Sequence, residues 1–404
     1  MRIAFVASRL VYPPDGGTPL RNYHLVRLAA ARHEVCAFAF ADATRTAGAL
    51  TNAGVRLQLV PPPPPRSTQE RLRALFFGRE PDLAMRFRSP ALLDGIQRFL
   101  PAFAPHLVQV QSLDMAFVVP FLRQLLPGCP IVLDEHNAEY LLQWRAARLD
   151  AYRPIAWHRA FYSLLQYRRL ARYEAVVCSA CQLVLAVSEE DRAALQAVAP
   201  RTPIAVVPNG IALQDYEDVR PYEAMASGVH FVFTGKMDFR PNVDAVLWFA
   251  HKVWPSLSQL LPHARFWIVG RDPVPAIRAL ARRPRVCVTG AVQDARPYIA
   301  GATVFVAPLR MGGGTRLKLL EAAALRRPIV ATPAACEGLP MRPGQDCLVA
   351  RTADEFIRAC HALVDDPGLA AQLGESAYQH VAVPLEWSAL LPRLEAAYAQ
   401  ALGR

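Results

Sequence analysis

The stretch Ala307-Pro-Leu-Arg-Met-Gly-Gly-Gly-Thr-Arg-Leu-Lys-Leu-Leu-Glu-Ala-Ala-Ala324 decides the fold of the second half of the chain. It begins at the end of a short apolar run, passes through three consecutive glycines and continues as a run of strong helix formers. This order predicts a buried strand, a glycine loop and a helix. Glycines let backbone amides approach a ligand, and the N-terminus of the helix that follows attracts negative charge. The stretch therefore predicts a phosphate-binding turn in an α/β unit.

Side chains around this loop suit a nucleotide. Arg316 and Lys318 place positive charge beside the predicted phosphate contact. Glu321 lies two turns into the helix, where a carboxylate can accept paired hydrogen bonds from the two hydroxyls of a ribose. A tight turn followed by a solvated glutamate is the alternative interpretation of the same residues. The candidate backbone contacts to the phosphate are Gly312, Gly313, Gly314 and Thr315.

Apolar runs and helical segments alternate on both sides of this stretch. Around residues 209–228 the pattern lapses into polar, proline-containing sequence and then restarts, which predicts two α/β halves with mostly parallel sheets. We expect a first α/β domain over 1–212, a connection over 213–228, a second α/β domain over 229–384 and a helix over 385–404. Two such halves facing a central cleft would place the ligand there. The predicted strands are 2–7, 33–40, 55–60, 107–111, 131–134, 183–187, 204–207, 230–234, 264–269, 285–288, 304–307 and 329–331, and the predicted helices include 18–31, 242–252, 317–325, 353–364 and 387–402.

Composition narrows the classes of partner. The 404 residues carry a net charge of +11, which favours an anionic partner such as a nucleotide diphosphate, an anionic lipid or a nucleic acid. We find no recognised nucleic-acid motif, so nucleic acid is the weakest of the three. Eight scattered cysteines do not resemble a disulfide framework, and the pair Cys178 and Cys181 lacks two further ligands at zinc spacing. Without a signal peptide or an apolar span of about 18 residues, we expect a cytoplasmic protein, with peripheral contact at the inner face of the membrane left open.

Polar residues follow two predicted strands of the first half. Asp134, Glu135, His136 and Asn137 come directly after an apolar strand, at the sheet edge where ligands bind. A histidine and carboxylates at such an edge can orient a ligand hydroxyl or act on it. A capped histidine at a strand end is the structural alternative. The glycines after the first strand, Gly16 and Gly17, are candidates for backbone contact with a phosphate or the acceptor.

Arginines and aromatic residues mix in residues 143–175. That combination suits an anionic membrane surface or a lipid-linked acceptor. The alternative is an ordinary solvated helix face whose aromatic side chains pack inward.

Several motifs together resemble one family, the retaining glycosyltransferases of family four. The segment Leu320-Glu-Ala-Ala-Ala-Leu-Arg-Arg-Pro-Ile-Val-Ala331 is similar to the family's "LEAMA-x-G-x-PVV". Other similar segments occur in the family's order: Pro14 to Gly17 ("P-x-x-GG"), Asp134 to Asn137, Ala186 to Glu190, Val207 to Ile211 ("PNG"), Phe233 to Asp244 ("F-x-G", including Gly235) and Val288 to Asp294, the base-binding region that includes Val292.

The resemblance implies a GT-B fold, in which two Rossmann-like doubly wound domains face a cleft and a C-terminal helix crosses back to the first domain. It implies a nucleotide diphosphate sugar as donor, with a UDP- or GDP-sugar expected, and a saccharide or lipid-linked acceptor. It also implies that residues 1–212 form the acceptor-side domain and residues 229–384 the donor domain. His136 would then orient the acceptor or a donor hydroxyl, and Asp134 or Glu135 would act on the acceptor hydroxyl. It also implies retention of anomeric configuration and no cofactor or divalent metal. Positive side chains and helix dipoles would instead stabilise the leaving diphosphate.

The chain departs from the family pattern at two charged positions. Glu321 matches the second glutamate of the E-x7-E motif, but Gly313 stands in place of the first. Lys236 takes the position of the family's arginine, Arg240 is a displaced candidate for its lysine, and Arg316 and Lys318 would compensate. A subgroup with "GGGTRLK-x-LEA", common in exopolysaccharide and exosortase-associated gene sets, shares these changes. The expected function is sugar transfer in surface polysaccharide synthesis; the alternatives are a nucleotide-sugar epimerase and a non-catalytic nucleotide-sugar-binding protein.

Overall fold

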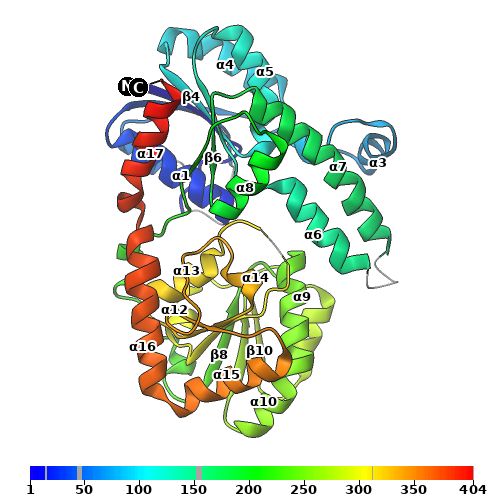
Figure 1. Ribbon diagram of the computed structural model, residues 1–404, viewed down its shortest axis with the longest axis vertical. Coiled ribbons are helices and arrows are strands. Elements are labelled where there is room, and N and C mark those ends of the chain that lie inside the picture. Colours follow the sequence, from blue (N-terminus) through cyan, green and yellow to red (C-terminus); the bar gives the residue numbers. More distant parts are fainter. Residues whose placement is uncertain (14–15, 43–47, 152–156, 312, 404) are drawn as a thin grey trace. The chain divides into compact units, whose positions relative to one another are not determined.

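The structure is a computed structural model that describes residues 1–13, 16–42, 48–151, 157–311 and 313–403. It divides into two compact units (Figure 1). Unit 1 comprises Met1–Asn209 together with Trp387–Arg404, and unit 2 comprises Gly210–Glu386. The predicted phosphate contact Gly312 lies outside the described residues.

Unit 1 is built on a parallel sheet that contains seven strands within the described residues. Helices cover both faces of the sheet, as its buried apolar central strands require. In spatial order the strands are β3 (Arg56–Val60), β2 (Glu34–Phe40), β1 (Arg2–Val6), β4 (Leu107–Gln111), β5 (Ile131–Asp134), β6 (Leu183–Ala186) and β7 (Ile204–Val206). Its helices are α1 (Gly17–Ala30), α2 (Gly48–Asn52), α3 (Thr68–Phe77), α4 (Pro90–Phe103), α5 (Val119–Leu125), α6 (Glu139–Ala151), α7 (Trp157–Ser179), α8 (Glu189–Val198) and α17 (Trp387–Ala401).

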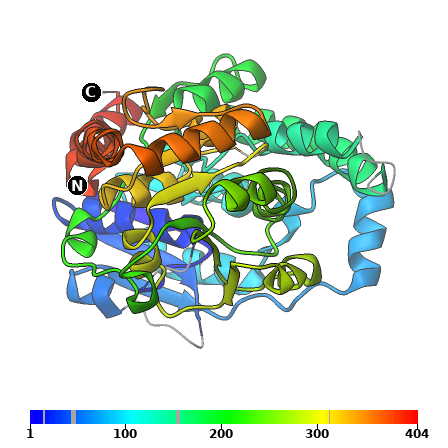
Figure 2. The same ribbon diagram turned by 90° about the horizontal axis from the view of Figure 1, so that it is seen from below.

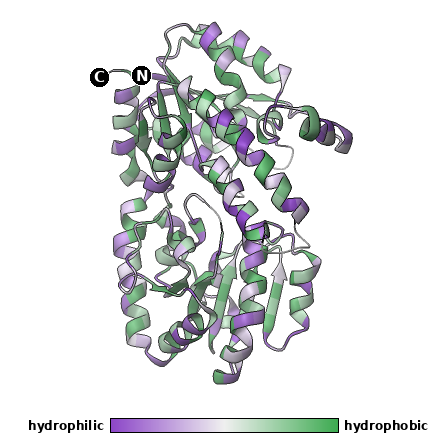
Figure 3. Cartoon of the chain, turned by 45° about the vertical axis from the view of Figure 1, so that its right-hand side comes forward, coloured by the Kyte–Doolittle hydropathy of each residue, from purple (hydrophilic) through white to green (hydrophobic). Residues whose placement is uncertain are grey.

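Unit 2 repeats the plan with a parallel sheet of six strands among the residues that the structure describes. Figure 3 shows the strands of both sheets as predominantly hydrophobic. The spatial order is β10 (Val286–Gly290), β9 (Arg265–Val269), β8 (His230–Thr234), β11 (Val304–Ala307), β12 (Ile329–Ala331) and β13 (Leu348–Val349). Its helices are α9 (Arg240–Trp248), α10 (Trp254–Leu260), α11 (Pro275–Arg278), α12 (Arg296–Ala300), α13 (Leu317–Ala324), α14 (Pro333–Cys336), α15 (Ala353–Asp365) and α16 (Pro367–Ala377).

The last helix returns to unit 1, as the sequence predicted. Trp387 opens α17 and stacks on His24 of α1, with ring centroids 4.8 Å apart. Near its other end, the Tyr398 hydroxyl donates to Gln109 Oε1 on β4 at 2.6 Å. The predicted α/β class, with two Rossmann-like sheets and a returning C-terminal helix, is confirmed.

One predicted helix is interrupted. The segment expected to be a helix over 242–252 starts earlier, at Arg240, because Pro241 takes a first-turn position where a missing N–H costs nothing. It then widens into a π-helical turn at Phe249–Val253 before continuing as α10. Pro255 lies at the start of α10 and lacks an N–H for the preceding ladder, which accounts for the change of winding at this position.

Candidate functional site

The strand order places a crevice at a defined edge of each sheet. In unit 2, β8 pairs in parallel with both β9 and β11, so the connections that leave β8 and β11 run in opposite directions along the sheet. Ligands of doubly wound sheets bind outside the carboxyl ends of strands at such a switch point. The residues that follow these two strands are Gly235-Lys236, after β8, and the glycine loop between β11 and α13. The predicted phosphate turn therefore lies at the switch point of the second sheet.

Gly235 is required by close packing at this point. Its φ is +153°, and a Cβ there would lie 2.6 Å from Asn242 Nδ2 and 2.9 Å from Lys318 Nζ. The packing is tighter still at Gly270, which follows β9. A Cβ added there would lie 1.8 Å from the Gly235 carbonyl oxygen. The absence of both side chains lets Asn242 and Lys318 reach the end of β8.

We expect Gly235→Ala to destabilise the fold by about 1–3 kcal/mol more than Gly228→Ala does. The added Cβ overlaps Asn242 and Lys318 at position 235 but overlaps no atom at position 228. Gly228 also has a positive φ, +99°, but a Cβ there meets nothing closer than 3.5 Å, so it controls for backbone strain. Urea unfolding of both variants measures the difference. Equal destabilisation would contradict the packing described for Gly235.

Lys318 is the most confined cation of the predicted set. Its ammonium donates to Asn242 Oδ1 at 2.8 Å and lies 3.9 Å from the centroid of the Phe233 ring. Asn242 is itself fixed, since its Nδ2 donates to the Lys236 carbonyl oxygen at 2.9 Å. Burial, assisted by the Arg316 charge, lowers the pKa of Lys318 to about 7, whereas Glu321 opposes the shift. An anion bound beside Lys318 would favour its charged form.

Glu321 shares a hydrogen bond with a residue that sequence reasoning missed. The Tyr216 hydroxyl donates to Glu321 Oε1 at 3.4 Å. Burial raises the pKa of Glu321 to about 7, with Lys318 opposing, and burial raises the pKa of Tyr216 well above its usual value. Tyr216 was assigned to the connection 213–228, where no motif distinguishes it. The guanidinium of Arg296 lies 5.8 Å from its ring centroid.

Arg316 lies against the glycine loop. Its Nη1 donates to the Gly313 carbonyl oxygen and, at 3.3 Å, to that of Gly314. The next residue before it, Thr315, has a buried hydroxyl that finds no hydrogen-bond partner among the described residues. The loop therefore combines a cation, a free hydroxyl and the N-terminus of α13, all of which suit a phosphate.

The other predicted donor-side residues lie at the rim of unit 2. The Lys236 ammonium pairs with Asp238 at 3.0 Å and Asp272 at 3.8 Å and is about half exposed. Arg240 is the first residue of α9, and Val292 follows β10 in a partly exposed loop. The Lys236 carbonyl oxygen accepts from Asn242, whose Oδ1 accepts from Lys318. The roles of Lys236, Arg240 and Val292 stay predictions.

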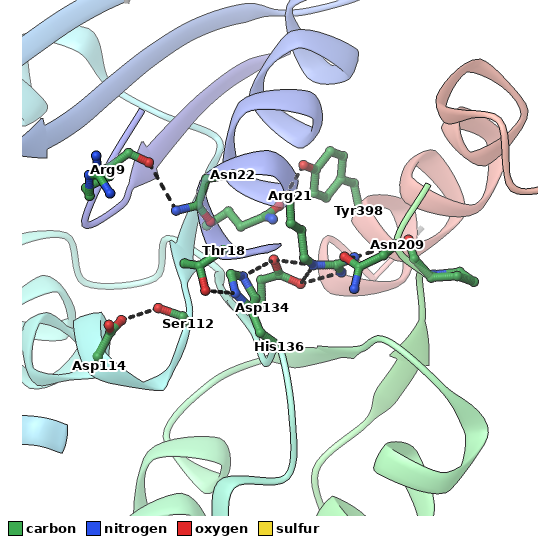
Figure 4. Close-up of polar contacts among 12 residues, drawn as sticks. Arg9, Thr18, Arg21, Asn22, Ser112, Asp114, Asp134, His136, Asn209 and Tyr398 are labelled. Atoms are coloured by element: carbon green, nitrogen blue, oxygen red, sulfur yellow. Dashed lines mark hydrogen bonds and ion pairs between the residues drawn. The ribbon is translucent and has the colours of Figure 1, made fainter. Parts of the chain in front are cut away.

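A second polar cluster lies in unit 1, at the ends of β5 and α1 (Figure 4). The carboxylate of Asp134 is buried and receives Nε and Nη2 of Arg21, with Nη2 2.6 Å from Oδ1. His136 Nε2 lies 3.2 Å from Asp134 Oδ2, and its Nδ1 lies 3.5 Å from Thr18 Oγ1. Arg21 Nη1 also donates to Asn209 Oδ1 at 3.2 Å. Arg21 therefore connects the predicted polar loop with the "PNG" turn. Arg21 belongs to α1, which begins at Gly17 and has Gly16 at its N-cap.

Both carboxylates of this cluster are buried. Asp134 is 0% exposed and pairs with Arg21, and Glu135 is 1% exposed. The carboxylate oxygens of Glu135 have no hydrogen-bond partner among the described residues, and burial raises its pKa well above the usual value. The role of Asp134 or Glu135 toward the acceptor hydroxyl stays a prediction. Asn137 donates to Glu139 Oε1 at 3.1 Å at the start of α6.

Family models match the two halves of the chain in turn. The model described as "Glycosyl transferase 4-like domain" matches residues 16–210, and the one described as "Glycosyl transferases group 1" matches residues 228–366. The chain belongs to a glycosyltransferase family of the GT-B fold. No curated protein matches it.

Solved structures share the fold of this glycosyltransferase over nearly its whole length. Sucrose-phosphate synthase from Thermosynechococcus elongatus is 16% identical, with a TM-score of 0.72 over 100% of this chain and 99% of that one. HepE from Anabaena, in complex with UDP and glucose, is 13% identical, with a TM-score of 0.66 over 98% and 99%. A glycosyltransferase from Rickettsia africae is 12% identical, with a TM-score of 0.63 over 99% and 98%. At these identities the likeness shows the fold alone, and it confirms the predicted GT-B class.

Proposed function

We propose that this glycosyltransferase transfers a sugar from a nucleotide diphosphate sugar to a saccharide or lipid-linked acceptor, with retention of anomeric configuration. The observation that carries the proposal is the group formed by Lys318, Glu321 and the glycine loop at the switch point of the second sheet. It offers a cation for a diphosphate and a carboxylate for a ribose on successive turns of one helix. HepE, which shares the fold, is described in complexes with UDP and UDP-glucose, which supports the same ligand class.

In the proposed reaction, negative charge develops on the leaving diphosphate. Lys318 and Arg316, together with the N-terminus of α13, would stabilise that charge, which is the principal catalytic contribution we assign to the protein. Lys236 and Arg240 are further candidate cations at the rim. Because these groups supply the positive charge, we propose that no divalent metal is needed. His136, held by Asp134, would orient a hydroxyl of the acceptor or donor sugar, and attack would occur on the face from which the diphosphate departs.

Release of nucleoside diphosphate from UDP- and GDP-sugars, measured with a chelator present, tests the proposal. NMR of the product sugar then reports its anomeric configuration. Acceptor-dependent release with retention is the expected result. Conversion of the donor to an epimer without acceptor would indicate the epimerase instead, and binding without turnover would indicate a non-catalytic protein.

We further propose that unit 1 contacts an anionic membrane through an aromatic patch, here defined as Phe76, Phe77, Trp157, Phe161 and Leu164. Phe77 is 84% exposed and Phe161 is 67% exposed. On α7 the three apolar residues recur at intervals of four and three residues, so they share one face, which Arg168 and Arg172 continue. Exposed aromatic and arginine side chains together suit the interface of an anionic bilayer. Among the described residues, no helix has the length and apolarity needed to span a bilayer.

Substituting Phe77→Ser and Phe161→Ser together is expected to reduce binding to vesicles that contain about one third anionic lipid by about tenfold, because the aromatic rings leave the interface. Co-sedimentation measures the effect. Phe99→Ser is the matched control, since Phe99 is also about half exposed but lies on α4. Equal sedimentation of all three proteins would exclude the aromatic patch as the contact.

A further inference from the structure

Unit 1 contains a hollow beside the aromatic patch that no predicted site accounts for. It has a volume of about 610 Å³ and lies among the proline segment 62–65, α3, residues 82–87 and α7. A smaller hollow of about 180 Å³ adjoins it between α3 and α7 and shares Arg71, Asp82, Tyr162 and Gln166. We call the two together the arginine groove. Figure 1 and Figure 2 both show α3 standing beside α7, away from the strands of unit 1.

Specific contacts hold the groove open. Arg169 of α7 donates to the Ala74 and Leu75 carbonyl oxygens at 3.1 and 2.7 Å, which fixes the C-terminal turn of α3. Gln166, buried on the same helix, accepts from the Asp82 amide at 3.1 Å. A prolyl segment cannot fold into a sheet or helix, so residues 62–65 form a stiff wall on the remaining side. The hollow is therefore a consequence of fixed packing rather than of a loose loop.

The charge of the groove is unbalanced toward positive. Its acids are already paired, because Asp82 accepts from Arg66 at 2.8 Å and Glu80 from Arg88 at 2.8 Å. Arg71 and Arg86 also line the groove, and neither forms an ion pair among the residues described. Arg66 adds a buried Nη2 that has no hydrogen-bond partner within the described part of the chain. These donors can receive an anion at no cost to an existing ion pair.

The remaining walls are apolar. Leu83, Phe87 and Leu170 line the larger hollow together with the proline rings. Arg86 lies 5.3 Å from the Phe87 ring centroid, so a cation and an apolar wall adjoin directly. Burial raises the pKa of Asp114, and the positive charge of Arg86 opposes this rise, as does that of His136.

We propose that the arginine groove binds the phosphate and first chain units of a lipid-linked acceptor. The proposal rests on the proposed function, since it names the acceptor class that the transferase would use. The two unpaired arginines would take the lipid phosphate or diphosphate, and the prolines, Leu83, Phe87 and Leu170 would take the start of one apolar chain. The volume suits a phosphate with a short single chain, within the range of about 300–1,000 Å³ usual for small-ligand sites. The aromatic patch beside the groove would rest on the bilayer from which such a lipid enters.

The test uses farnesyl phosphate below its micelle concentration, with farnesol and inorganic phosphate as partial ligands, and calorimetry on the full chain. We expect farnesyl phosphate to bind at least about tenfold more tightly than either partial ligand. It alone can contact both the arginines and the apolar wall of the groove. The double variant Arg71→Gln/Arg86→Gln should weaken that binding by about tenfold or more. The matched control is Arg73→Gln, an exposed arginine of the same helix that lines neither hollow and should change binding less than about twofold.

Three results would overturn the proposal: no binding of farnesyl phosphate, equal binding of farnesol, or an equal loss in Arg73→Gln. The second would indicate partition into an apolar surface, and the third a general charge effect. Nucleoside diphosphate affinity is measured on the same samples. It should be unchanged in the double variant, because Arg71 and Arg86 lie in unit 1 and the nucleotide site lies in unit 2. The far-ultraviolet circular dichroism of the double variant should also match that of the unmodified protein. If the unmodified protein does not bind a nucleoside diphosphate, the proposed function is contradicted. Failure of the groove proposal and failure of the proposed function therefore give different results.

Discussion

The variant Lys318→Met is expected to release nucleoside diphosphate from a bound nucleotide sugar about 10²–10³-fold more slowly than the unmodified enzyme. Lys318 is fixed between Asn242 Oδ1 and the Phe233 ring, so its charge is held in place before the reaction begins. A fixed cation needs no reorganisation as the diphosphate gains charge, which makes it more effective than a solvated one. Methionine keeps the apolar volume over the ring and removes the charge together with the hydrogen bond to Asn242 Oδ1.

Lysine is rare in this chain, which supplies a matched control. Lys252→Met makes the same chemical change at an exposed position on the far end of the π-helical turn. It should leave the rate within about twofold. Initial rates of diphosphate release at saturating donor distinguish the two variants. A Lys318→Met enzyme with an unchanged rate would remove Lys318 from the mechanism.

The pKa values near the site add a pH signature to the same variant. Burial lowers the pKa of Lys318 to about 7, so its charge is present below that pH and lost above it. Burial raises the pKa of Glu321 to about 7, so its carboxylate is present above that pH and lost below it. Affinity for a nucleotide sugar, whose diphosphate keeps its charge throughout, should therefore peak near pH 7. Lys318→Met should remove the loss of affinity on the alkaline side, and Glu321→Gln the loss on the acidic side.

The variant Glu321→Ala is expected to weaken nucleotide binding by about 1–3 kcal/mol, or about 5- to 150-fold in Kd. The carboxylate is already oriented by the Tyr216 hydroxyl, so it can accept from ribose hydroxyls with little loss of side-chain freedom. The exposed Glu217, in the same unit, provides the control variant Glu217→Ala.

A modified nucleotide makes this test specific to the ribose. A 2′,3′-dideoxy nucleoside diphosphate lacks the hydroxyls that Glu321 would bind, so unmodified protein and Glu321→Ala should bind it equally. Titration calorimetry with both nucleotides closes the cycle. If the variant weakens the dideoxy nucleotide as much as the normal one, Glu321 acts on stability or charge and not on the ribose.

The buried strands were the most predictable part of the fold. The ends of β4, β5, β8 and β11 agree with the predicted ranges, because each is a short apolar run bounded by polar or turn residues. The interruption of the helix predicted over 242–252 was not foreseen, since nothing in the local periodicity marks a π-helical turn. The two-residue strand β13 was also missed, because two residues are too few to form a pattern.

The site was predictable where chemistry is concentrated in one segment and unpredictable where it depends on tertiary contacts. The glycine loop, Lys318 and Glu321 lie within ten residues of one another, so their shared role could be inferred from the sequence. Tyr216 contacts Glu321 across 105 positions, and Arg21 contacts Asp134 across 113. Only the three-dimensional structure reveals such partners. The burial of Asp134 likewise depends on tertiary packing, including its contact with Arg21 of α1.

Thermal unfolding of the purified protein with UDP, GDP, ADP, CDP or dTDP, in the presence of a chelator, shows whether the glycine loop and α13 bind a nucleotide. We expect one of these diphosphates to raise the Tm without any metal, since a ligand that binds only the folded state stabilises it. The same diphosphate should raise the Tm of Glu321→Ala much less. If no diphosphate shifts the Tm of the unmodified protein, with or without metal, the assignment of a nucleotide-sugar site to the glycine loop and α13 is contradicted.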